Sequence, residues 1–269
     1  MFRIKMLFAV LFTLLLTASG CTQVTEDYLQ ISFLKIGKAD AIILNTQKSA
    51  VLIDAGEDDD GSEILEKAKS RGIERFDYMI ITHYDKDHVG GAAEVIKGIE
   101  IGEIIEPGYE KSSDAYSAFC AAANNAGIKR TVPEGNISFV LDGVHYDIMM
   151  PIADRYPNEN DCSIAVKATY FSKSALFTGD ALDIRMDELM NEDISCNILK
   201  VPHHGSYEGT SKEFFNAASA QYAVITCSDK NPADEKTVLA LEEAGAKPLL
   251  TSNGDIQIFF TEKNIEVLQ

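Results

Sequence analysis

Two histidines and two aspartates lie within six residues of the segment Thr82-His83-Tyr84-Asp85-Lys86-Asp87-His88-Val89-Gly90-Gly91. Imidazole nitrogens and carboxylate oxygens are common ligands of divalent metal ions in proteins. We therefore expect four metal ligands in this segment: His83, Asp85, Asp87 and His88. In an extended chain alternate side chains share a face, so His88 would approach from a different side than the other three. That geometry suits two metal ions better than one.

The elements beside this motif are predicted from its flanks. An apolar run over residues 76–81 leads directly into it, which indicates a buried strand with the ligands on the loop at its C-terminal end. Gly90 and Gly91 carry no Cβ, so the backbone can fold closely behind the ligands. A helix is expected to begin near Ala92. A rigid strand and a helix would thus hold a reactive loop between them.

The motif resembles the His-x-His-x-Asp-His-x-Gly-Gly signature of the metallo-β-lactamase superfamily, with Asp85 where most branches have the second His. It is similar in this to the nuclease-like domain of ComEC-type competence proteins, which has His-x-Asp-x-Asp-His. The segment 33–41 resembles the opening of that branch, but Lys35, Lys38 and Ala39 depart from its pattern.

The resemblance covers nearly all of residues 31–269. It implies a four-layer αβ/βα sandwich, an α/β (α+β) fold of two mixed β-sheets with helices on the outer faces. Periodicity alone indicates only an α/β or α+β chain with ligands on loops.

Two further segments resemble the family. Residues 175–180 end in Thr-Gly-Asp, whose Asp bridges both metals in the family, so Asp180 is the expected bridge. Residues 199–206 are similar to Leu-Lys-Val-Pro-His-His-Gly-Ser, where one histidine is expected to bind metal and the other to move protons. Of the two we favour His203 for metal and His204 for acid–base work. The residues expected to act in catalysis are Asp87, Asp180 and His204.

Other residues are expected to support the ligands without binding metal. By the resemblance, Asp40 and Asp54 would orient ligands, although for Asp40 a simple turn carboxylate is an equal alternative. Asn160 lies where some branches have a His ligand, so the first metal site is expected to be poorer in nitrogen, with Asn160 or Asp161 nearby.

A final His ligand of the family is missing from residues 231–235. Asp234, Glu235 or water would have to replace it. The gap weakens the expectation of a fully competent second site.

The ligand set predicts hydrolytic chemistry. Three carboxylates against two divalent ions leave a local charge of about +1, which attracts an anionic substrate and lowers the pKa of a bridging water to yield hydroxide. The extra oxygen donor of Asp85 favours manganese or magnesium without excluding zinc. Lys86 and Lys200 stand beside ligands in the sequence and are candidates to bind substrate phosphate. Solvated lysines at loop edges are at least an equal alternative.

The N-terminus reads as a lipoprotein-type signal peptide. Arg3 and Lys5 precede an apolar run over residues 6–16, and small residues then lead to Cys21. We expect a signal peptide over residues 1–20, lipidation of Cys21, a tether over 21–30 and one domain over 31–269. A short uncleaved anchor is the alternative. Either reading places the domain outside the cytoplasm, on a membrane of the bacterial cell envelope.

The charge of the chain bears on its substrate. Without residues 1–20 the chain has 22 basic against 42 acidic residues, a formal charge of about −20. Such a surface repels long nucleic acids, so a small phosphodiester or a short oligonucleotide is the better substrate. Protein partners are not predicted. The four remaining cysteines are expected to be buried thiols: Cys120, Cys162, Cys196 and Cys227.

The combined expectation is a membrane-tethered, metal-dependent hydrolase, of phosphodiesterase or nuclease-like type by the resemblance. Two alternatives stay open. One is hydrolysis of another ester, amide or lactone, because the superfamily uses one metal centre on many substrates. The other is a non-catalytic protein that keeps the fold and binds a ligand or partner.

Overall fold

A computed structural model describes residues 27–153 and 155–269. The expected signal peptide and Cys21 lie outside the described residues. The first strand, β1, begins at Tyr28, so the last residues of the expected tether belong to the sheet. In the described part of the chain, every helix is too short or too polar to cross a lipid bilayer.

The first sheet mixes antiparallel and parallel strands. β1, β2 and β3 form an antiparallel meander, and β3 to β6 run parallel. In spatial order its strands are β15 (Ile265–Leu268), β14 (Ile256–Thr261), β1 (Tyr28–Phe33), β2 (Ile42–Asn45), β3 (Ala50–Ile53), β4 (Arg75–Ile80), β5 (Glu100–Ile105) and β6 (Lys129–Thr131).

The second sheet is also mixed. Its first two strands form a hairpin at Asp142 and Gly143, both with positive φ, as the Asp-Gly pair predicts. From β10 onward the strands run parallel. The spatial order is β13 (Lys247–Leu250), β12 (Tyr222–Ile225), β11 (Ile198–Lys200), β10 (Lys173–Phe177), β9 (Ala165–Tyr170), β8 (Val144–Met149) and β7 (Ile137–Leu141).

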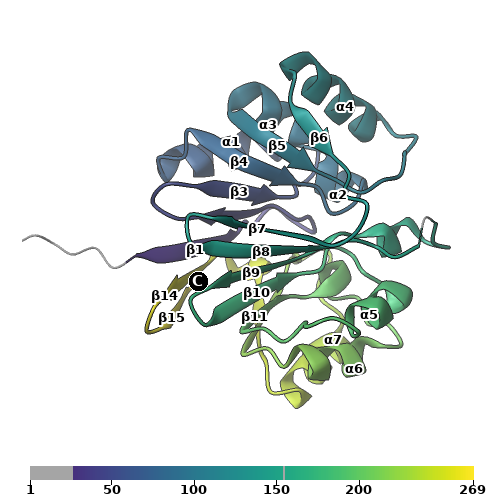
Figure 1. Ribbon diagram of the computed structural model, residues 1–269. Coiled ribbons are helices and arrows are strands. Elements are labelled where there is room, and N and C mark those ends of the chain that lie inside the picture. The colour runs from purple at the N-terminus through teal and green to yellow at the C-terminus, as the bar shows by residue number, and fades with distance from the viewer. Residues whose placement is uncertain (1–26, 154) are drawn as a thin grey trace, which may run out of the picture.

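Helices cover the outer face of each sheet (Figure 1). The first sheet is covered by α1 (Gly61–Ser70), α3 (Ala92–Gly98) and α4 (Asp114–Ala126), and the second by α5 (Asp183–Leu189), α6 (Ser211–Ala218) and α7 (Glu235–Glu243). Short turns of helix lie in loops: α2 (Lys86–Val89), η1 (Glu159–Cys162), η2 (Pro202–Gly205) and η3 (Thr251–Asn253).

The alternation of side chains along strands divides the core into layers. In β2, Ile42 and Leu44 pack between the two sheets, while Ile43 points to the helices outside. A third apolar cluster joins the second sheet to its own helices. The order is therefore helix, sheet, sheet, helix, and the predicted four-layer αβ/βα sandwich is confirmed.

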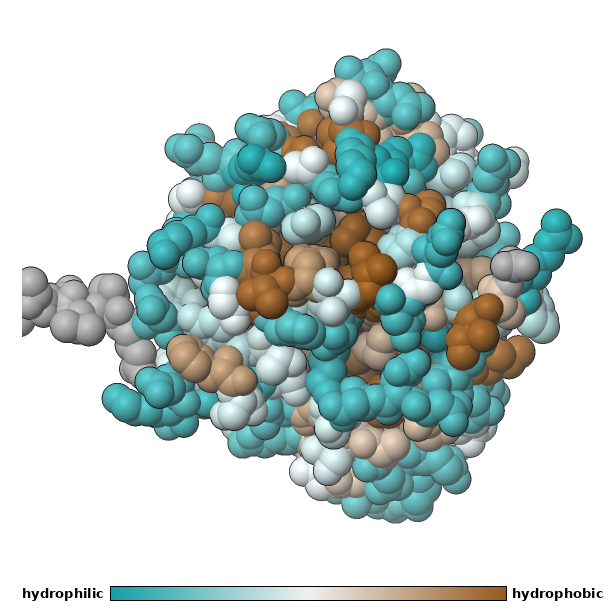
Figure 2. Space-filling view, in the orientation of Figure 1, coloured by the Kyte–Doolittle hydropathy of each residue, from teal (hydrophilic) through white to brown (hydrophobic). Residues whose placement is uncertain are grey.

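The described cysteines are unpaired thiols, as expected. Cys162, Cys196 and Cys227 are buried and Cys120 is half-buried. On the face shown in Figure 2, hydrophilic residues surround several separate apolar patches. That surface agrees with the strongly acidic composition of the chain.

Candidate metal centre

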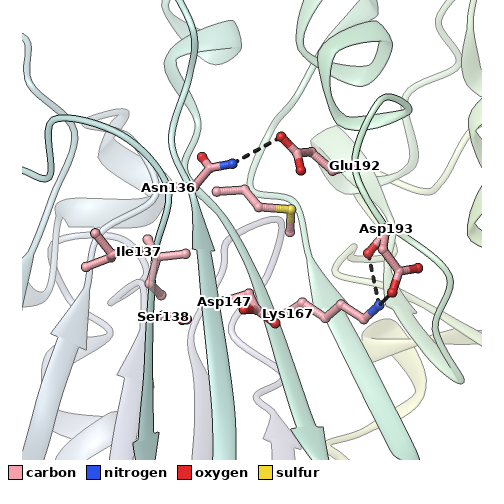
Figure 3. A pocket seen from close by; sticks show the side chains of 9 residues that line it. Asn136, Ile137, Ser138, Asp147, Lys167, Glu192 and Asp193 are labelled. Carbon is pink, nitrogen blue, oxygen red and sulfur yellow. Dashed lines mark hydrogen bonds and ion pairs between the residues drawn. The ribbon is translucent and has the colours of Figure 1, made fainter.

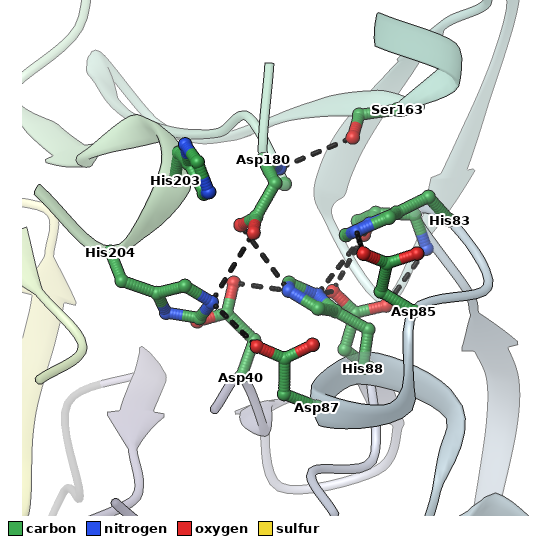
Figure 4. A network of polar contacts seen from close by, with 12 residues as sticks. Asp40, His83, Asp85, Asp87, His88, Ser163, Asp180, His203 and His204 are labelled. Atoms are coloured by element: carbon green, nitrogen blue, oxygen red, sulfur yellow. Dashed lines mark hydrogen bonds and ion pairs between the residues drawn. The ribbon is translucent and has the colours of Figure 1, made fainter. Parts of the chain in front are cut away.

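The predicted site residues come together at one edge of the sandwich. Asp180, His204 and Thr226 follow β10, β11 and β12, which are parallel neighbours, so their carboxyl ends meet at the same edge. The motif after β4 reaches that edge from the first sheet. Figure 4 shows its side chains converging with those from the second sheet.

Four side chains form a compact cluster, each offering one ligand atom within 4.8 Å of the others: Asp87, His88, Asp180 and His204. Asp180 lies at its centre, with Oδ1 3.2 Å from His88 Nε2 and Oδ2 3.3 Å from His204 Nε2. Asp87 Oδ2 is 3.3 Å from His204 Nε2. Two imidazoles and two carboxylates thus face a common point.

Several ligand atoms of the site are buried and make no hydrogen bond within the described residues: Nε2 of His83, His88 and His204, and Oδ1 of Asp180. A buried polar atom left without a partner destabilises the fold by about 1–3 kcal/mol. A divalent ion would satisfy such nitrogen and oxygen atoms together. The residues present therefore fit a metal.

A carboxylate fixes the orientation of His88. His88 Nδ1 lies 2.8 Å from Asp54 Oδ2, and Asp54 also accepts hydrogen bonds from the backbone N–H and the hydroxyl of Thr82, each at 2.8 Å. Asp54 has a left-handed φ of 57°, a conformation that non-glycine residues rarely hold without surrounding support. Because Nδ1 faces Asp54, Nε2 is the ring nitrogen that faces the cluster.

A second chain of contacts orients His204. Its Nδ1 lies 3.1 Å from the Thr226 carbonyl, and the Thr226 hydroxyl donates to Asp40 Oδ1 at 2.6 Å. Asp40 in turn pairs with Lys200 Nζ at 2.6 Å. These contacts fit the supporting role expected of Asp40. Thr226 carried no signal in the sequence, since a threonine after a strand is ordinary.

Both candidate lysines are paired with other groups of the protein. Lys200 is fully buried below the cluster, donates to Gly179 O at 3.1 Å and lies 3.6 Å from Asp180 Oδ1. Lys86 is exposed, and it pairs with Glu57 at 3.1 Å and Asp58 at 3.2 Å. One lysine supports the carboxylates from beneath, and the other is held by acidic neighbours on the surface.

Only the first part of the motif is extended. The chain turns into α2 after Asp85, whose carbonyl accepts hydrogen bonds from the N–H groups of His88 and Val89. The prediction of an extended segment through His88 is wrong, because this helical turn rotates Asp87 and His88 together into the cluster. The expected role of Gly90 is confirmed, since a Cβ there would lie 2.6 Å from Asp58 N.

His203 and His204 point in different directions, although both have left-handed φ angles, 47° and 52°. The sequence favoured His203 as the ligand and His204 for proton transfer. In the structure His204 lies in the cluster, while His203 is partly exposed and has Nδ1 3.5 Å from Glu208 Oε1. The geometry therefore favours the reverse assignment.

The candidate replacements for missing ligands make contacts elsewhere. Asp161 Oδ1 accepts hydrogen bonds at the start of α5, from the N–H groups of Leu182 and Arg185. Asp234 caps α7 by accepting from Lys236 N at 2.9 Å. Asn160 is buried in η1 beside these groups, outside the cluster of four.

The first half of the motif, His83 and Asp85, lies outside the four-residue cluster. His83 Nε2 lies 3.9 Å from Asp85 Oδ2, and the other oxygen of Asp85 contacts the ammonium of Lys111. Lys111 also contacts Glu159 Oε2 at 2.6 Å. The contact of Lys111 with Asp85 could not be predicted from the sequence, because Lys111 stands in a loop 26 residues after Asp85 and no motif surrounds it.

Charges in the cluster depend strongly on one another. Burial, helped by His88, lowers the pKa of His83 to about 3, so this imidazole is neutral. Burial also opposes the charged forms of His88 and His204, but Asp180 and the other carboxylates outweigh it and raise both pKa values. Burial likewise opposes the charged form of Asp180, yet His204, His88 and Lys200 hold its pKa well below the usual range. Protons and a metal ion would therefore compete for the same Nε2 atoms.

A separate hollow of about 330 Å³ lies against β7, β8 and β9 (Figure 3). Lys167 Nζ is 2.9 Å from Asp193 Oδ2 there, and Asn136 donates to Glu192 at 3.1 Å. The cation in this hollow is already paired, and no predicted site residue lines it. This hollow is therefore separate from the cluster around Asp180.

Known proteins are similar to this chain in sequence or in fold. The chain is 25% identical over 264 residues to Recombination protein 2 of Haemophilus influenzae, covering 92% of this chain and 31% of that protein. It is 26% identical over 253 residues to ComE operon protein 3 of Bacillus subtilis, covering 85% and 32%. The chain spans about a third of the length of these curated relatives.

Among solved structures, a diphosphatase of the PhnP family has a similar fold, with a TM-score of 0.50 and 14% sequence identity over 87% of this chain and 99% of that one. The model of the Metallo-beta-lactamase superfamily matches residues 35–228, which include every residue of the four-ligand cluster. The chain belongs to the metallo-beta-lactamase superfamily.

Proposed function

We propose that this chain is a metal-dependent hydrolase whose substrate is a small phosphodiester or a short oligonucleotide. The observation that carries the proposal is the set of buried ligand atoms without hydrogen bonds, brought together from separate loops around Asp180. A cluster that served only the fold would leave these atoms unsatisfied at a cost in stability. Binding of a divalent ion removes that cost.

The first ion is assigned to the four-ligand cluster: Asp87, His88, Asp180 and His204. With equal numbers of oxygen and nitrogen donors, manganese is expected to support activity at least as well as zinc. A second ion, as the sequence led us to expect, would need His83 and Asp85 as ligands. The number of ions therefore depends on whether His83 and Asp85 bind metal.

The residues of this chain divide the chemical work. When bound, the ion would supply Lewis-acid activation of water and of a substrate oxygen. Asp54 and Thr226 hold the imidazoles of His88 and His204 in place. His203 is 26% exposed and stands beside His204 in the chain, so we assign proton transfer to His203, whose Nδ1 lies 3.5 Å from Glu208 Oε1.

The substrate class is supported by relatives and by charge. One relative is named a recombination protein, another is named for the ComE operon, and one structural neighbour is called a diphosphatase. A hollow of about 630 Å³ next to the acidic loop at Asp59 contains three lysines, but four acidic residues line it too: Glu57, Asp59, Asp60 and Asp229. Such a mixed surface gives no continuous basic track for a long polyanion.

The test is side-by-side kinetics on bis(p-nitrophenyl) phosphate, single strands and duplex DNA across a salt series, with Mn²⁺ present. We expect faster cleavage of the small diester and of short strands than of duplex, and loss of all cleavage in Asp180→Ala. Efficient duplex cleavage with a steep salt dependence would overturn the short-substrate proposal. Cleavage confined to other esters, amides or lactones would favour the alternative in which the substrate is not a phosphodiester.

A second candidate is a protein that binds a metal or ligand without turnover. It is favoured by the contact of Lys111 with Asp85, which occupies a carboxylate that a two-metal enzyme would use. Stoichiometric metal binding, with no Asp180-dependent hydrolysis of phosphodiesters, esters or lactams, would support this reading over catalysis.

We also propose that the chain is anchored outside the cytoplasm by a lipid on Cys21, as its N-terminal sequence indicates. Cys21→Ser should release the protein from membranes or block its maturation. An unchanged membrane fraction with unaltered processing would favour an uncleaved N-terminal anchor. Because Cys21 precedes the domain, metal binding by the variant serves as the control for folding.

A further inference from the structure

Lys111 is built into the metal centre by buried contacts that fix its loop. The loop runs from β5 to α4, and Tyr84, next to the ligands, donates its hydroxyl to Glu106 Oε2 at 2.9 Å and to Pro107 O at 2.8 Å. The Tyr84 N–H donates to Tyr109 Oη at 2.9 Å. Arg130 holds Glu106 from the other side at 2.7 Å. The loop that carries Lys111 is therefore attached to the motif itself.

The ammonium of Lys111 lies between two carboxylates. It contacts Asp85 and is 2.6 Å from Glu159 Oε2, while its side chain is only 22% exposed. The Asp85 oxygen that remains lies 3.9 Å from His83 Nε2, a buried atom with no hydrogen bond. Imidazole nitrogen and carboxylate oxygen are ligand types that a divalent ion takes, and the ammonium of Lys111 contacts both carboxylates, Asp85 and Glu159.

We propose that Lys111 takes the place of a second metal ion, so that the chain binds a single divalent ion at the cluster around Asp180. The inference rests on the proposed function, in which that cluster binds metal. An ammonium and a divalent cation repel each other at contact distance and compete for the same oxygen of Asp85, so both cannot occupy this half of the motif. The lysine also neutralises Asp85 without needing any ion.

This assignment changes the charge of the centre. One divalent ion and Lys111 together balance three carboxylates, Asp85, Asp87 and Asp180, where two divalent ions would leave an excess of about +1. A centre near neutrality attracts a polyanion less strongly, which favours substrates with few phosphates. A single-ion centre and the acidic surface thus both favour small substrates over long polyanions.

The test compares metal stoichiometry in the full chain and in Lys111→Met, which keeps the length of the side chain and removes its charge. Both proteins are stripped of metal, equilibrated with a Mn²⁺ series and measured by elemental analysis and electron paramagnetic resonance. We expect one ion in the wild type, with the spectrum of an isolated ion. Lys111→Met should bind two ions and show the exchange coupling of two neighbouring ions.

Two controls separate charge from packing. Lys129→Met removes an exposed lysine paired with Glu103 at 2.8 Å, away from the centre, and should keep one ion. Lys111→Arg keeps the positive charge and should also keep one ion. Circular dichroism and thermal melting establish that each variant is folded.

A second variant tests the same inference without touching Lys111. If Asp85 does not bind metal in the native chain, Asp85→Asn should still bind one ion with affinity changed by no more than about threefold, well below the roughly 10–100-fold loss typical of residues that orient ligands. Two ions in the wild type, or a large loss of affinity in Asp85→Asn, would overturn the inference. One ion in both the wild type and Lys111→Met would do so as well. No ion in the wild type would instead reject the proposed function itself.

Discussion

The two halves of the His-x-Asp-x-Asp-His motif have similar side chains and different surroundings. Asp87 and His88 stand on a helical turn, where Asp54 orients the imidazole and Asp180 and His204 complete a buried cluster. His83 and Asp85 stand on the extended part of the loop, where Asp85 is one-third exposed and contacts Lys111. The same ligand types therefore gather into a compact four-residue cluster only in the half where other loops supply partners.

The largest effect is expected from the neighbouring histidines after β11. His204→Gln removes a cluster ligand and should lower Mn²⁺ affinity by more than the roughly 10–100-fold that an orienting residue contributes. His203→Gln should leave affinity nearly unchanged and reduce turnover, because His203 faces Glu208 and solvent. Isothermal titration of both variants checks the assignment. Equal losses in the two would contradict it.

A smaller loss of metal affinity is expected when the carboxylate that orients His88 is removed and the four ligands are kept. Asp54→Asn should lower metal affinity by roughly 10–100-fold, because the amide no longer holds the Nδ1 proton of His88. Asn tolerates the left-handed backbone at this position, so the fold should survive. Asp142→Asn, also left-handed but in the hairpin between β7 and β8, is the matched control and should bind metal normally.

The halves should also differ in their response to pH. In the metal-free chain the raised pKa values of His88 and His204 keep protons on these rings above the usual range, so a metal ion must displace them. Apparent affinity should therefore rise with pH, by about tenfold per pH unit for each proton displaced. Mn²⁺ titrations over about pH 6 to 9 measure this slope. A flat profile would contradict proton competition.

The extra site opened in Lys111→Met should show little of this slope. Burial keeps His83 neutral, with a pKa of about 3, so its imidazole releases no proton when an ion binds. Comparing the slopes of the two binding steps in that one variant would separate the halves directly.

The smallest effect is expected at Lys86. Its ammonium is exposed and pairs with Glu57 and Asp58, so Lys86→Met should change neither metal affinity nor kcat/KM by more than about twofold. A melting curve unchanged from wild type would show that the exposed pairs contribute little. A large rise in KM for the phosphodiester would restore the substrate role that the sequence suggested for this lysine.

The four layers were predicted from the resemblance to the family, whereas local patterns in the sequence indicated where single elements begin and end. Ser113 and Gly127 mark the ends of α4, with Ser113 accepting from Tyr116 N and Gly127 at a φ of 65°. Strand alternation marked the inner and outer faces, as in β2. These signals depend on neighbours in the chain, so they can be read without knowing which distant segments meet.

The residues that contact the ligands could not be predicted, because they are distant from the ligands in the sequence. Thr226 and Asp40 meet across 186 residues, and Lys111 meets Asp85 across 26, with no motif marking either pair. The choice between His203 and His204 depends on two successive left-handed residues in η2, which aim adjacent side chains apart. Such geometry is fixed by packing between loops and not by residue type.

The buried pair of Lys200 and Asp40 joins the two sheets at the edge that holds the cluster. Asp40 lies in the loop before β2 of the first sheet, and Lys200 ends β11 of the second. Separating the sheets at this edge would expose both charges of a pair that has no access to water. The two halves of the sandwich are therefore fastened at the place where the ligands must meet, so opening of this edge and loss of the ligand geometry would be a single cooperative event.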